Sequence, residues 1–310
     1  MSYVLIALLI LLGLFLLLAI ASYLLFGYAC VRVKAVEEGD PGAVWRDYQA
    51  ELDKGAEWIA ENKTETLEIT SCDDLLLKGW LVPAENAKGT LILMHGYRSR
   101  AAVDYAPQAK FLHGLGYNLI IVMQRSHDQS EGRYITFGSK ECMDCKLWVH
   151  EAIRLFGKES DIFLCGISMG ASTVMMASQL QLPENVKGIV ADCGFTSPWD
   201  IMSHVAKTTM HLPTFPLVHT ASILTKHIAR FDPKNPSALE AMRVNKYPTL
   251  FIHGGDDTFV PTYMSEKNYA ACASPKELLI IPKAHHAQAY LVEPETYQKA
   301  VTEFFGKYSS

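Results

Sequence analysis

The octapeptide CGISMGAS, residues 165–172, decides how the rest of the chain is interpreted. It carries the pattern Gly-x-Ser-x-Gly, with Ser168 between Gly166 and Gly170. An apolar run, DIFLCGI, ends directly before Ser168, and a helix-forming run, MGASTVMMASQL, begins directly after it. This context is typical of a nucleophilic serine on a sharp strand-to-helix turn, where a side chain at either glycine would collide with neighbouring backbone. The pentapeptide alone is weakly specific, so the interpretation depends on the surrounding scaffold.

Short apolar runs alternate with longer helical segments on both sides of this turn. TLEIT and LLLKGWLVP flank the turn SCDD and predict an antiparallel strand pair. Six later runs are continuously apolar and are bounded by Gly, Pro or Asp: TLILMHG, YNLIIVM, DIFLCGI, VKGIVADC, PTLFIHG and ELLIIP. Strands that are apolar on both faces, most of them followed by a helix, indicate a parallel sheet covered on two sides. The predicted fold is α/β, with a mostly parallel eight-stranded sheet and helices on both faces.

One interval breaks this alternation. Residues 196–246 separate two of the strands, which is far more than a single crossover helix requires. An insertion at the carboxyl edge of a parallel sheet lies over the crevice where such folds bind ligands. We interpret it as a small helical cap, with ordinary crossover helices and a long loop as the alternative. From their position alone, Trp199 and Phe215 are predicted to bind substrate.

A serine nucleophile requires a base, an acid that orients the base, and donors for the oxyanion. For a serine on a strand-to-helix turn, the acid and then the base follow later in the chain, near strand ends. The candidates in these places are Asp192, Asp256 and Asp257 for the acid, and His285 and His286 for the base. The residues alone leave both choices open, but the order Ser, Asp, His predicts that Ser168 is a nucleophile.

Two backbone amides are predicted to form the oxyanion hole. Met169 follows the nucleophile at the start of a helix, whose amino end carries partial positive charge. Tyr97 follows Gly96 in HGYRS, directly after the strand TLILMHG. His95 in the same segment is interpreted as a residue that pins this loop through a side-chain hydrogen bond.

Taken together, these segments resemble one bacterial branch of the α/β-hydrolase superfamily, whose members are membrane-anchored or cytosolic serine hydrolases of esterase or peptidase-like type. The resemblance covers roughly residues 65–308 and rests on LILMHGYRS, LCGISMGASTVMMAS, VADCGFTSPWD, LFIHGGDDTFVP and AHHAQAYLVEPETYQKAVTEFF. It implies Asp257 as the acid, three residues before the Val-Pro pair, and His286 as the base in HAQAY. The chain departs from the family pattern at Asp128, where a glycine is usual.

The N-terminal segment is apolar and uncharged from Tyr3 to Tyr28. As a helix it would be about 39 Å long, enough to cross a hydrocarbon core of about 30 Å. No basic region precedes it, and it is longer than the core of a signal peptide. An uncleaved, single-pass transmembrane anchor over residues 1–31 is therefore favoured over a removed signal peptide or a lipid-modified Cys30.

Charge and cysteine content bear on location and partners. Arg32 and Lys34 follow the apolar segment, so the positive-inside rule favours a cytoplasmic catalytic domain. Seven cysteines, an odd number, fit a reducing compartment better than a disulfide framework. The net charge of −5 gives no reason to expect nucleic acid as a partner. We expect a juxtamembrane helical segment over residues 32–64 and a hydrolase domain over residues 65–310.

The predicted activity is hydrolysis of carboxylic esters, taken from small molecules or lipids, through an acyl-enzyme. This chemistry requires no metal or organic cofactor. Cys142 and Cys145 form a CMDC pair, but no second ligand pair accompanies them, so we predict no metal site there. Aminopeptidase-like cleavage and acyl transfer are the alternatives on the same triad, and a non-catalytic scaffold is disfavoured.

Overall fold

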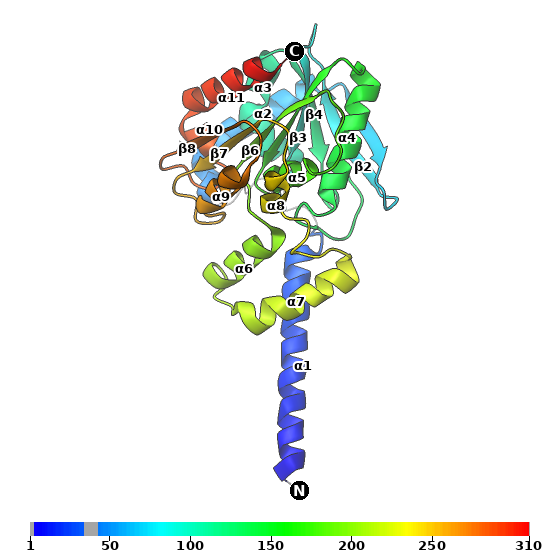
Figure 1. The fold of residues 1–310 in the computed structure, drawn as a ribbon, viewed down its shortest axis with the longest axis vertical. Coiled ribbons are helices and arrows are strands. Elements are labelled where there is room, and N and C mark those ends of the chain that lie inside the picture. Colours follow the sequence, from blue (N-terminus) through cyan, green and yellow to red (C-terminus); the bar gives the residue numbers. More distant parts are fainter. Residues whose placement is uncertain (1–2, 34–42, 310) are drawn as a thin grey trace.

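A mixed eight-stranded sheet forms the centre of the protein's body in the computed structural model, which describes residues 3–33 and 43–309 (Figure 1). The strand order is β1-β2-β4-β3-β5-β6-β7-β8. The strands are β1 (Glu65–Thr70), β2 (Leu76–Val82), β3 (Gly89–Met94), β4 (Tyr117–Met123), β5 (Asp161–Ile167), β6 (Val186–Asp192), β7 (Thr249–Gly254) and β8 (Lys276–Ile281). Only the pairs β1–β2 and β2–β4 are antiparallel, so the prediction of a mostly parallel eight-stranded sheet is confirmed.

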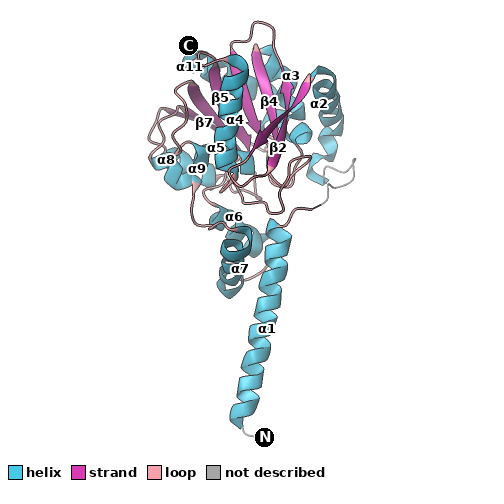
Figure 2. Cartoon of the chain, turned by 90° about the vertical axis from the view of Figure 1, so that its right-hand side faces the viewer, coloured by secondary structure: helices cyan, strands magenta, loops and turns pink. Residues whose placement is uncertain are grey.

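The central strands are buried on both faces, as their continuous apolar runs require. Every residue of β3, β4, β5 and β7 is buried. One face is covered by α2 (Gln49–Asn62), α3 (Ala101–Gly114), α10 (Ala289–Val292) and α11 (Pro294–Tyr308). The other face is covered by α4 (Glu141–Phe156), α5 (Met169–Ala177), α8 (Ala238–Arg243) and α9 (Tyr263–Ala271) (Figure 2). Helices on both faces explain why these strands show no polar alternation.

The segment predicted as juxtamembrane packs on the body in its described part. Its described part comprises a 3₁₀ helix, η1 (Ala43–Tyr48), and α2, while residues 34–42 lie outside the described residues. The Trp58 ring meets His113 of α3 edge-on with ring centroids 5.3 Å apart, and Ile59 is buried in the same core as Leu112. The apolar residues that predicted this helix therefore cover α3.

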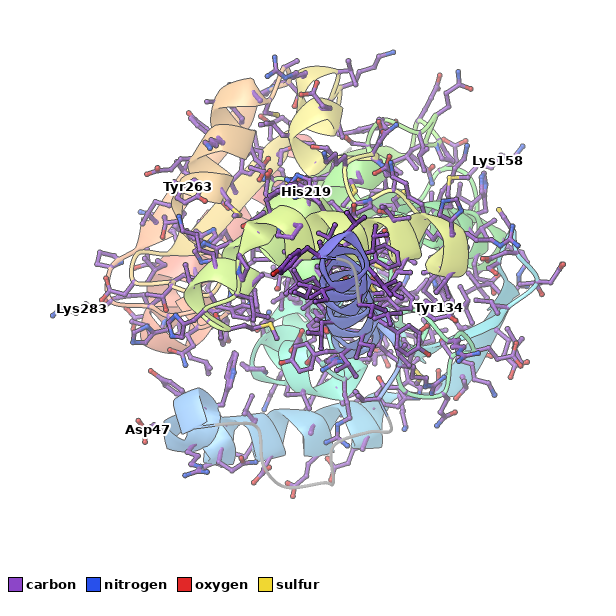
Figure 3. All side chains as sticks on the ribbon, turned by 90° about the horizontal axis from the view of Figure 1, so that it is seen from below. Asp47, Tyr134, Lys158, His219, Tyr263 and Lys283 are labelled. Carbon is purple, nitrogen blue, oxygen red and sulfur yellow. The ribbon has the colours of Figure 1, made fainter. Side chains whose placement is uncertain are left out.

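The interval 196–246 divides into two parts. Helix α6 (Pro198–Thr208), two π-helical turns η2 (Thr214–Val218) and η3 (Thr225–Ala229), and α7 (His219–Leu224) lie beyond the carboxyl edge of the sheet (Figures 1 and 3). We call residues 198–229 the cap. The remaining helix, α8, packs on α5 and α9 of the body, because Ala238, Ala241 and Met242 are buried there.

A long helix, α1 (Tyr3–Cys30), projects from the body past the cap (Figure 1). It is the one helix among the described residues that is long and apolar enough to cross a membrane. Its C-terminal end is joined to the body, because the Ile135 amide donates to the Cys30 carbonyl oxygen at 2.7 Å. The Arg32 guanidinium donates to the backbone oxygens of Ser130 at 2.7 Å and Asp128 at 2.6 Å. Arg32 thus binds the body, and Lys34 lies outside the described residues.

Candidate active site

Ser168 lies on a strained turn between β5 and α5. Its backbone has φ 55° and ψ −115°, which is unusual for a residue with a side chain. A Cβ on Gly166 would lie 2.2 Å from the Gly170 carbonyl oxygen, and a Cβ on Gly170 would lie 1.9 Å from that of Met94. The Ser168 amide donates to the Asp192 carbonyl oxygen at 2.8 Å, which fixes the turn. Only glycine at both positions lets the turn form and present the serine at the sheet edge.

A chain of hydrogen bonds joins Ser168, His286 and Asp257, which come from the ends of three different strands. His286 Nε2 lies 2.9 Å from Ser168 Oγ, and His286 Nδ1 lies 2.7 Å from Asp257 Oδ2. An ionised carboxylate can only accept, so Nδ1 carries the proton and Nε2 is free to accept from the serine hydroxyl. This arrangement can withdraw a proton from Ser168 as it attacks a carbonyl carbon.

Asp257 is held in place by donors on both oxygens. Its Oδ1 accepts from the amides of Phe259 and Val260, each at 2.9 Å, and His253 Nε2 lies 3.2 Å from Oδ2. Burial raises the pKa of Asp257, but hydrogen bonds from His253 and His286 outweigh burial and hold it well below its usual range. The carboxylate is therefore ionised at neutral pH.

His253 is a residue that the sequence analysis missed. It is fully buried, and its Nδ1 lies 2.6 Å from Ser265 Oγ. The available signal was its position in PTLFIHG, at the end of the strand that leads to Asp257.

The rival candidates from the sequence lie elsewhere. Asp256 and His285 are exposed and contact each other through His285 Nδ1 and the Asp256 carbonyl oxygen at 3.1 Å. Asp192 is buried beside Tyr297, and burial raises its pKa to about 6. Within the described residues, these geometries leave Asp257 as the carboxylate that hydrogen-bonds His286.

The loop after β3 places Gly96 and Tyr97 close to Ser168. A Cβ on Gly96 would lie 3.3 Å from Ser168 Cβ, and the Gly96 amide donates to Asp104 Oδ2 at 2.6 Å. Met169 is the first residue of α5, where backbone amides have no intrahelical acceptor. The amides predicted to form the oxyanion hole, those of Tyr97 and Met169, thus belong to backbone segments on either side of Ser168.

Two histidines hold this loop. His95 Nε2 accepts from the Gln124 amide at 3.1 Å, in agreement with its predicted pinning role. His127 Nε2 accepts from the Arg98 amide at 3.0 Å, and burial lowers the pKa of His127 to about 3. The neighbouring Asp128, where the family pattern usually has glycine, has φ 43° and accepts from the Ala101 amide at 3.0 Å. It thereby supplies an acceptor at the start of α3.

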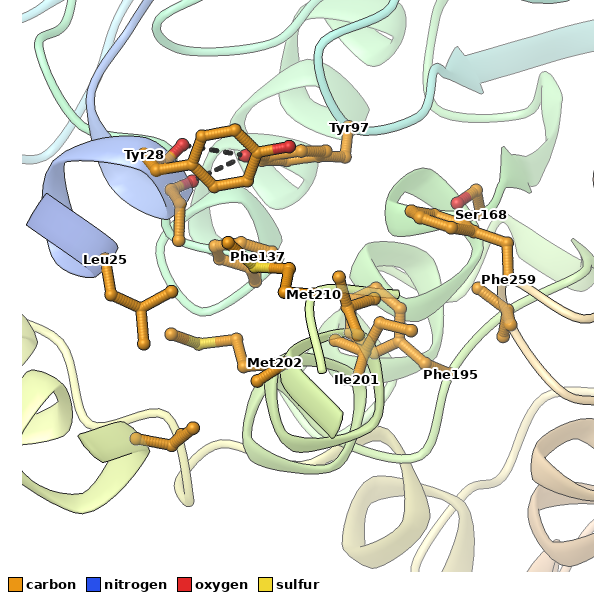
Figure 4. A pocket seen from close by; sticks show the side chains of 15 residues that line it. Leu25, Tyr28, Tyr97, Phe137, Ser168, Phe195, Ile201, Met202, Met210 and Phe259 are labelled. Carbon is orange, nitrogen blue, oxygen red and sulfur yellow. Dashed lines mark hydrogen bonds between the residues drawn. The ribbon is translucent and has the colours of Figure 1, made fainter. Parts of the chain in front are cut away.

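Two cavities meet at Ser168, and Figure 4 shows the first of them. The first, which we call the apolar cavity, has a volume of about 90 Å³. Its walls come from α1, α6 and the loops around Ser168, and include Leu25, Tyr28, Ala29, Met202, Val205, Phe195 and Phe259. The second, which we call the polar cavity, has a volume of about 220 Å³ and is lined by residues that include Trp45, Arg98, Ser99, Asp104 and His286. A substrate that reaches Ser168 can therefore extend in two directions of different polarity.

Neither residue predicted to bind substrate from the cap lines either cavity. Trp199 is partly buried, and its ring meets His219 edge-on with centroids 4.8 Å apart. Phe215 is 75% exposed on the outer surface of the cap. Position in the sequence placed both on the cap but could not show which face each would occupy. The cap contributes Met202 and Val205 to the cavity instead.

One cluster of possible metal ligands lies at the site among the described residues. Ligand atoms of Cys193, Asp257 and His286 lie within 4.8 Å of one another. Both His286 nitrogens are already engaged, by Asp257 and Ser168, and burial raises the pKa of the Cys193 thiol. The cluster fits a hydrogen-bonded triad better than a cation site. Cys142 and Cys145 are buried free thiols on α4.

Tyr97 and Arg98 also connect the active-site loop to α1. The Tyr97 hydroxyl donates to the Ala29 carbonyl oxygen at 2.8 Å, and the Arg98 guanidinium donates to the Tyr28 carbonyl oxygen. The Tyr97 ring stacks on Phe137 with centroids 5.0 Å apart. From the sequence, a role is expected for the Tyr97 amide alone, and no local pattern indicates the link between its side chain and α1.

A serine on a strand-to-helix turn, hydrogen-bonded to a histidine and an aspartate at the carboxyl edge of this sheet, defines the molecule as an α/β-hydrolase. Comparison with known proteins gives the family: the chain belongs to the serine aminopeptidase S33 family of hydrolases, whose model matches residues 85–242. The resemblance noted in the sequence is thereby confirmed at the level of the superfamily.

Individual relatives agree with this assignment. The chain is 28% identical to the uncharacterized protein YqkD of Bacillus subtilis (strain 168) over 231 residues, 74% of each chain. The Pyrococcus furiosus esterase Pf2001 is similar in structure, with a TM-score of 0.64 and 25% identity, over 81% of this chain and 94% of the esterase. The Pyrococcus horikoshii acylaminoacyl peptidase has a TM-score of 0.58 at 18% identity, over 82% of this chain and 43% of the peptidase. This last likeness shows the fold alone.

Proposed function

We propose that this hydrolase cleaves carboxylic esters, with Ser168 as the nucleophile, His286 as the general base and Asp257 as the acid that orients His286. The observation that carries the proposal is the pair of hydrogen bonds through His286, at 2.9 Å to Ser168 and 2.7 Å to Asp257. Both distances lie within the range over which a base can take a proton from a nucleophile.

The mechanism follows from these positions. Ser168 Oγ attacks the ester carbonyl carbon while His286 Nε2 takes its proton. The amides of Tyr97 and Met169 donate to the oxyanion, a contribution worth about 3–4 kcal/mol per donor where it has been measured. Ionised Asp257 stabilises the imidazolium that forms. His286 then protonates the departing alcohol, and a water molecule that His286 activates releases the acid from Ser168.

The lining of the two cavities favours an ester over a peptide with a free amino terminus. Recognition of an α-ammonium group calls for unpaired carboxylates near the nucleophile. Asp104 is the one acidic residue among the described residues that line either cavity. Its two oxygens already accept from the Gly96 amide and from the Ser99 hydroxyl. The similarity to an esterase at 25% identity supports the same choice.

The N-terminal helix supports a further part of the proposal, a single-pass membrane anchor that stays attached to the enzyme. The C-terminal end of α1 contacts the cap through Leu25 and the active-site loop through Ala29. Removal of α1 as a signal peptide would expose these surfaces on the body. We place the catalytic domain on the cytoplasmic side, which protease accessibility in sealed inverted and right-side-out vesicles tests.

Covalent labelling tests the catalytic proposal. A fluorophosphonate probe is expected to modify Ser168 in the detergent-solubilised full chain, located by the mass of the modified peptide. Ser168→Ala is expected to lose both the label and hydrolysis of 4-methylumbelliferyl butyrate. Ser203→Ala is the matched control, because the Ser203 hydroxyl is buried without a hydrogen-bond partner among the described residues. Label that persists in Ser168→Ala, or a folded wild type that takes none, would refute the assignment.

Substrate preference needs a second comparison. Aminoacyl 4-nitroanilides are expected to be cleaved far more slowly than butyrate esters. The opposite preference would support aminopeptidase activity, and acyl transfer to an added alcohol in preference to water would support a transferase.

A further inference from the structure

The apolar cavity is built partly from the helix that we propose as the membrane anchor. Leu25, Tyr28 and Ala29 of α1 line it together with Ser168. Figure 4 shows Leu25 and Tyr28 across the cavity from Ser168. The nucleophile and the anchor therefore share one apolar space.

The cap lies at the depth where a bilayer would end. Twenty residues of α-helix rise about 30 Å, so a hydrocarbon core that begins at Tyr3 ends near Ser22. The Ser22 hydroxyl shares a hydrogen bond with that of Thr220 in α7. Helix α7 crosses α1 in Figure 1 and passes beside α1 in the view along that helix in Figure 3. The cap is thus placed at the interface between hydrocarbon and headgroups, and Leu25 lies one helical turn beyond it.

The outer surface of the cap has the composition of an interfacial segment. Phe215, Ile223 and Ile228 are 75%, 53% and 37% exposed. Within the cap, Lys207 and Lys226 are the basic residues and Asp200 is the acidic residue, and Lys226 forms an ion pair with Asp232 at 2.8 Å. Exposed apolar side chains on a helical segment favour burial at the interface of a bilayer.

The cavity suits an alkyl chain but is short. Met202, Val205 and Met210 line it with apolar and, for the methionines, adaptable side chains. Its volume is about 90 Å³, smaller than a cavity of about 150 Å³ that holds one benzene molecule. A long chain attached to a carbonyl at Ser168 would fill the cavity with its first carbons and then continue outward. The wall formed by Leu25 of α1 with Ala206 and Val218 of the cap leads toward the bilayer.

We infer that the substrate is a long-chain fatty acyl ester resident in the bilayer, and that its acyl chain enters along the seam between α1 and the cap without leaving the membrane. This inference rests on the proposed esterase function. The ester C–O bond breaks, and the acyl group passes to Ser168 Oγ and then to water. The alcohol leaves through the polar cavity with the proton that His286 returns. The anchor is on this basis part of the substrate-binding site.

The test compares a long and a short ester on the full chain in vesicles of phosphatidylcholine and phosphatidylglycerol. The long ester is 4-methylumbelliferyl oleate within the vesicles, and the short ester is the soluble butyrate. Leu25→Trp narrows the seam, so the ratio of oleate to butyrate hydrolysis is expected to fall at least about tenfold. Leu24→Trp places the same ring on the outer surface of α1, where Leu24 is 65% exposed, and is expected to keep the wild-type ratio.

A second pair of variants tests the contact with the bilayer without altering the cavity. Phe215→Glu is expected to lose activity on the vesicle-borne oleate and to retain it on the same ester in detergent micelles. Val244→Glu is the control, because Val244 is 60% exposed at the end of α8 on the body. This pair decides the question if Leu25→Trp fails to fold, which loss of fluorophosphonate labelling would reveal.

The outcomes separate the inference from the proposed function. An unchanged ratio in a folded Leu25→Trp, or equal effects of Phe215→Glu and Val244→Glu, overturns membrane entry and leaves the esterase standing. If the folded wild type hydrolyses neither ester and takes no fluorophosphonate label, the proposed esterase function is overturned, and the inference falls with it.

Discussion

The hydroxyl group of Tyr97 donates a hydrogen bond to the carbonyl oxygen of Ala29 at 2.8 Å. Ala29 is in the last turn of α1, where carbonyl groups lack intrahelical donors. Tyr97 also carries one of the amides proposed to hold the oxyanion, next to Ser168. One residue thus satisfies the end of α1 with its side chain and, in the proposed mechanism, donates to the oxyanion with its backbone.

Tyr97→Phe tests this connection. The variant keeps the amide and the ring that stacks on Phe137, and it removes only the donor to Ala29. We expect a loss of about 1 kcal/mol in the free energy of unfolding, because a carbonyl at the helix end loses its partner. Hydrolysis of the butyrate ester is expected to fall by less than about tenfold. Thermal unfolding in detergent and steady-state rates measure the two effects.

Tyr263→Phe provides the comparison for this variant, because Tyr263 is 45% exposed on α9 of the body. Equal stabilities for the two variants would show that the Tyr97 hydroxyl does not secure α1.

Replacement of the acid distinguishes between two buried aspartates. Asp257→Asn keeps the shape of the side chain but favours the wrong tautomer of His286, so kcat is expected to fall about 10⁴-fold, as in other serine triads. Asp192→Asn leaves the bond between His286 and Asp257 intact and is expected to cost less than about tenfold. Rates on the butyrate ester, with circular dichroism to confirm folding, give the ratio. If kcat fell further in Asp192→Asn than in Asp257→Asn, Asp192 and not Asp257 would be the acid that orients His286.

Local patterns in the sequence predicted the sheet and the turn at Ser168 well. A strand buried on both faces must be continuously apolar, so β3 to β7 were visible without knowledge of their neighbours. The two glycines around Ser168 are required because backbone atoms lie within a few ångströms of each. Their spacing in the sequence therefore indicates the geometry of the turn.

Contacts between distant segments could not be predicted in this way. The periodicity of α2 indicated a helix with one apolar face, but many surfaces can cover such a face, and here the surface is α3. Position in the sequence indicated the cap for Trp199 and Phe215, but the direction of their side chains depends on what each short helix packs against, and neither lines the two cavities. The approach of α1 to Ser168 joins residues more than a hundred positions apart, and no local pattern records it.

The glycines of the turn can be tested directly. Gly170→Ala would place a Cβ 1.9 Å from the Met94 carbonyl oxygen, and neither backbone can move without disturbing β3. We expect a loss of at least about 4 kcal/mol or no folded protein, an exceptionally large effect, because the added Cβ would overlap backbone atoms that cannot move. Gly114→Ala, where an added Cβ meets nothing within 4 Å, is expected to be neutral or to stabilise by up to about 1 kcal/mol. Yield of folded protein and the unfolding midpoint report both, and a well-folded Gly170→Ala would contradict the packing of this turn.

The stability of the protein should depend on pH through His127. Burial lowers the pKa of His127 to about 3 in the folded state, while an unfolded histidine titrates near 6.5. The unfolded chain therefore binds a proton that the folded chain does not between these two values, and protonation favours unfolding. Above pH 6.5, His127 does not destabilise the folded protein. As pH falls from 6.5 toward 3, the destabilisation by His127 grows. Between pH 6.5 and 5 it amounts to about 2 kcal/mol, at about 1.4 kcal/mol per pH unit.

His127→Gln isolates this effect, because a glutamine oxygen can still accept from the Arg98 amide and does not titrate. We expect the wild type to lose stability more steeply than this variant between pH 6.5 and 5, with the difference close to one proton. His150→Gln, at a histidine exposed on α4, should retain the wild-type slope. Unfolding midpoints measured across this pH range in detergent decide the matter. If the slopes of the wild type and His127→Gln coincide, the pKa of His127 is not lowered by folding. His127 would then take up a proton in the folded protein, and Nε2 could not accept from the Arg98 amide.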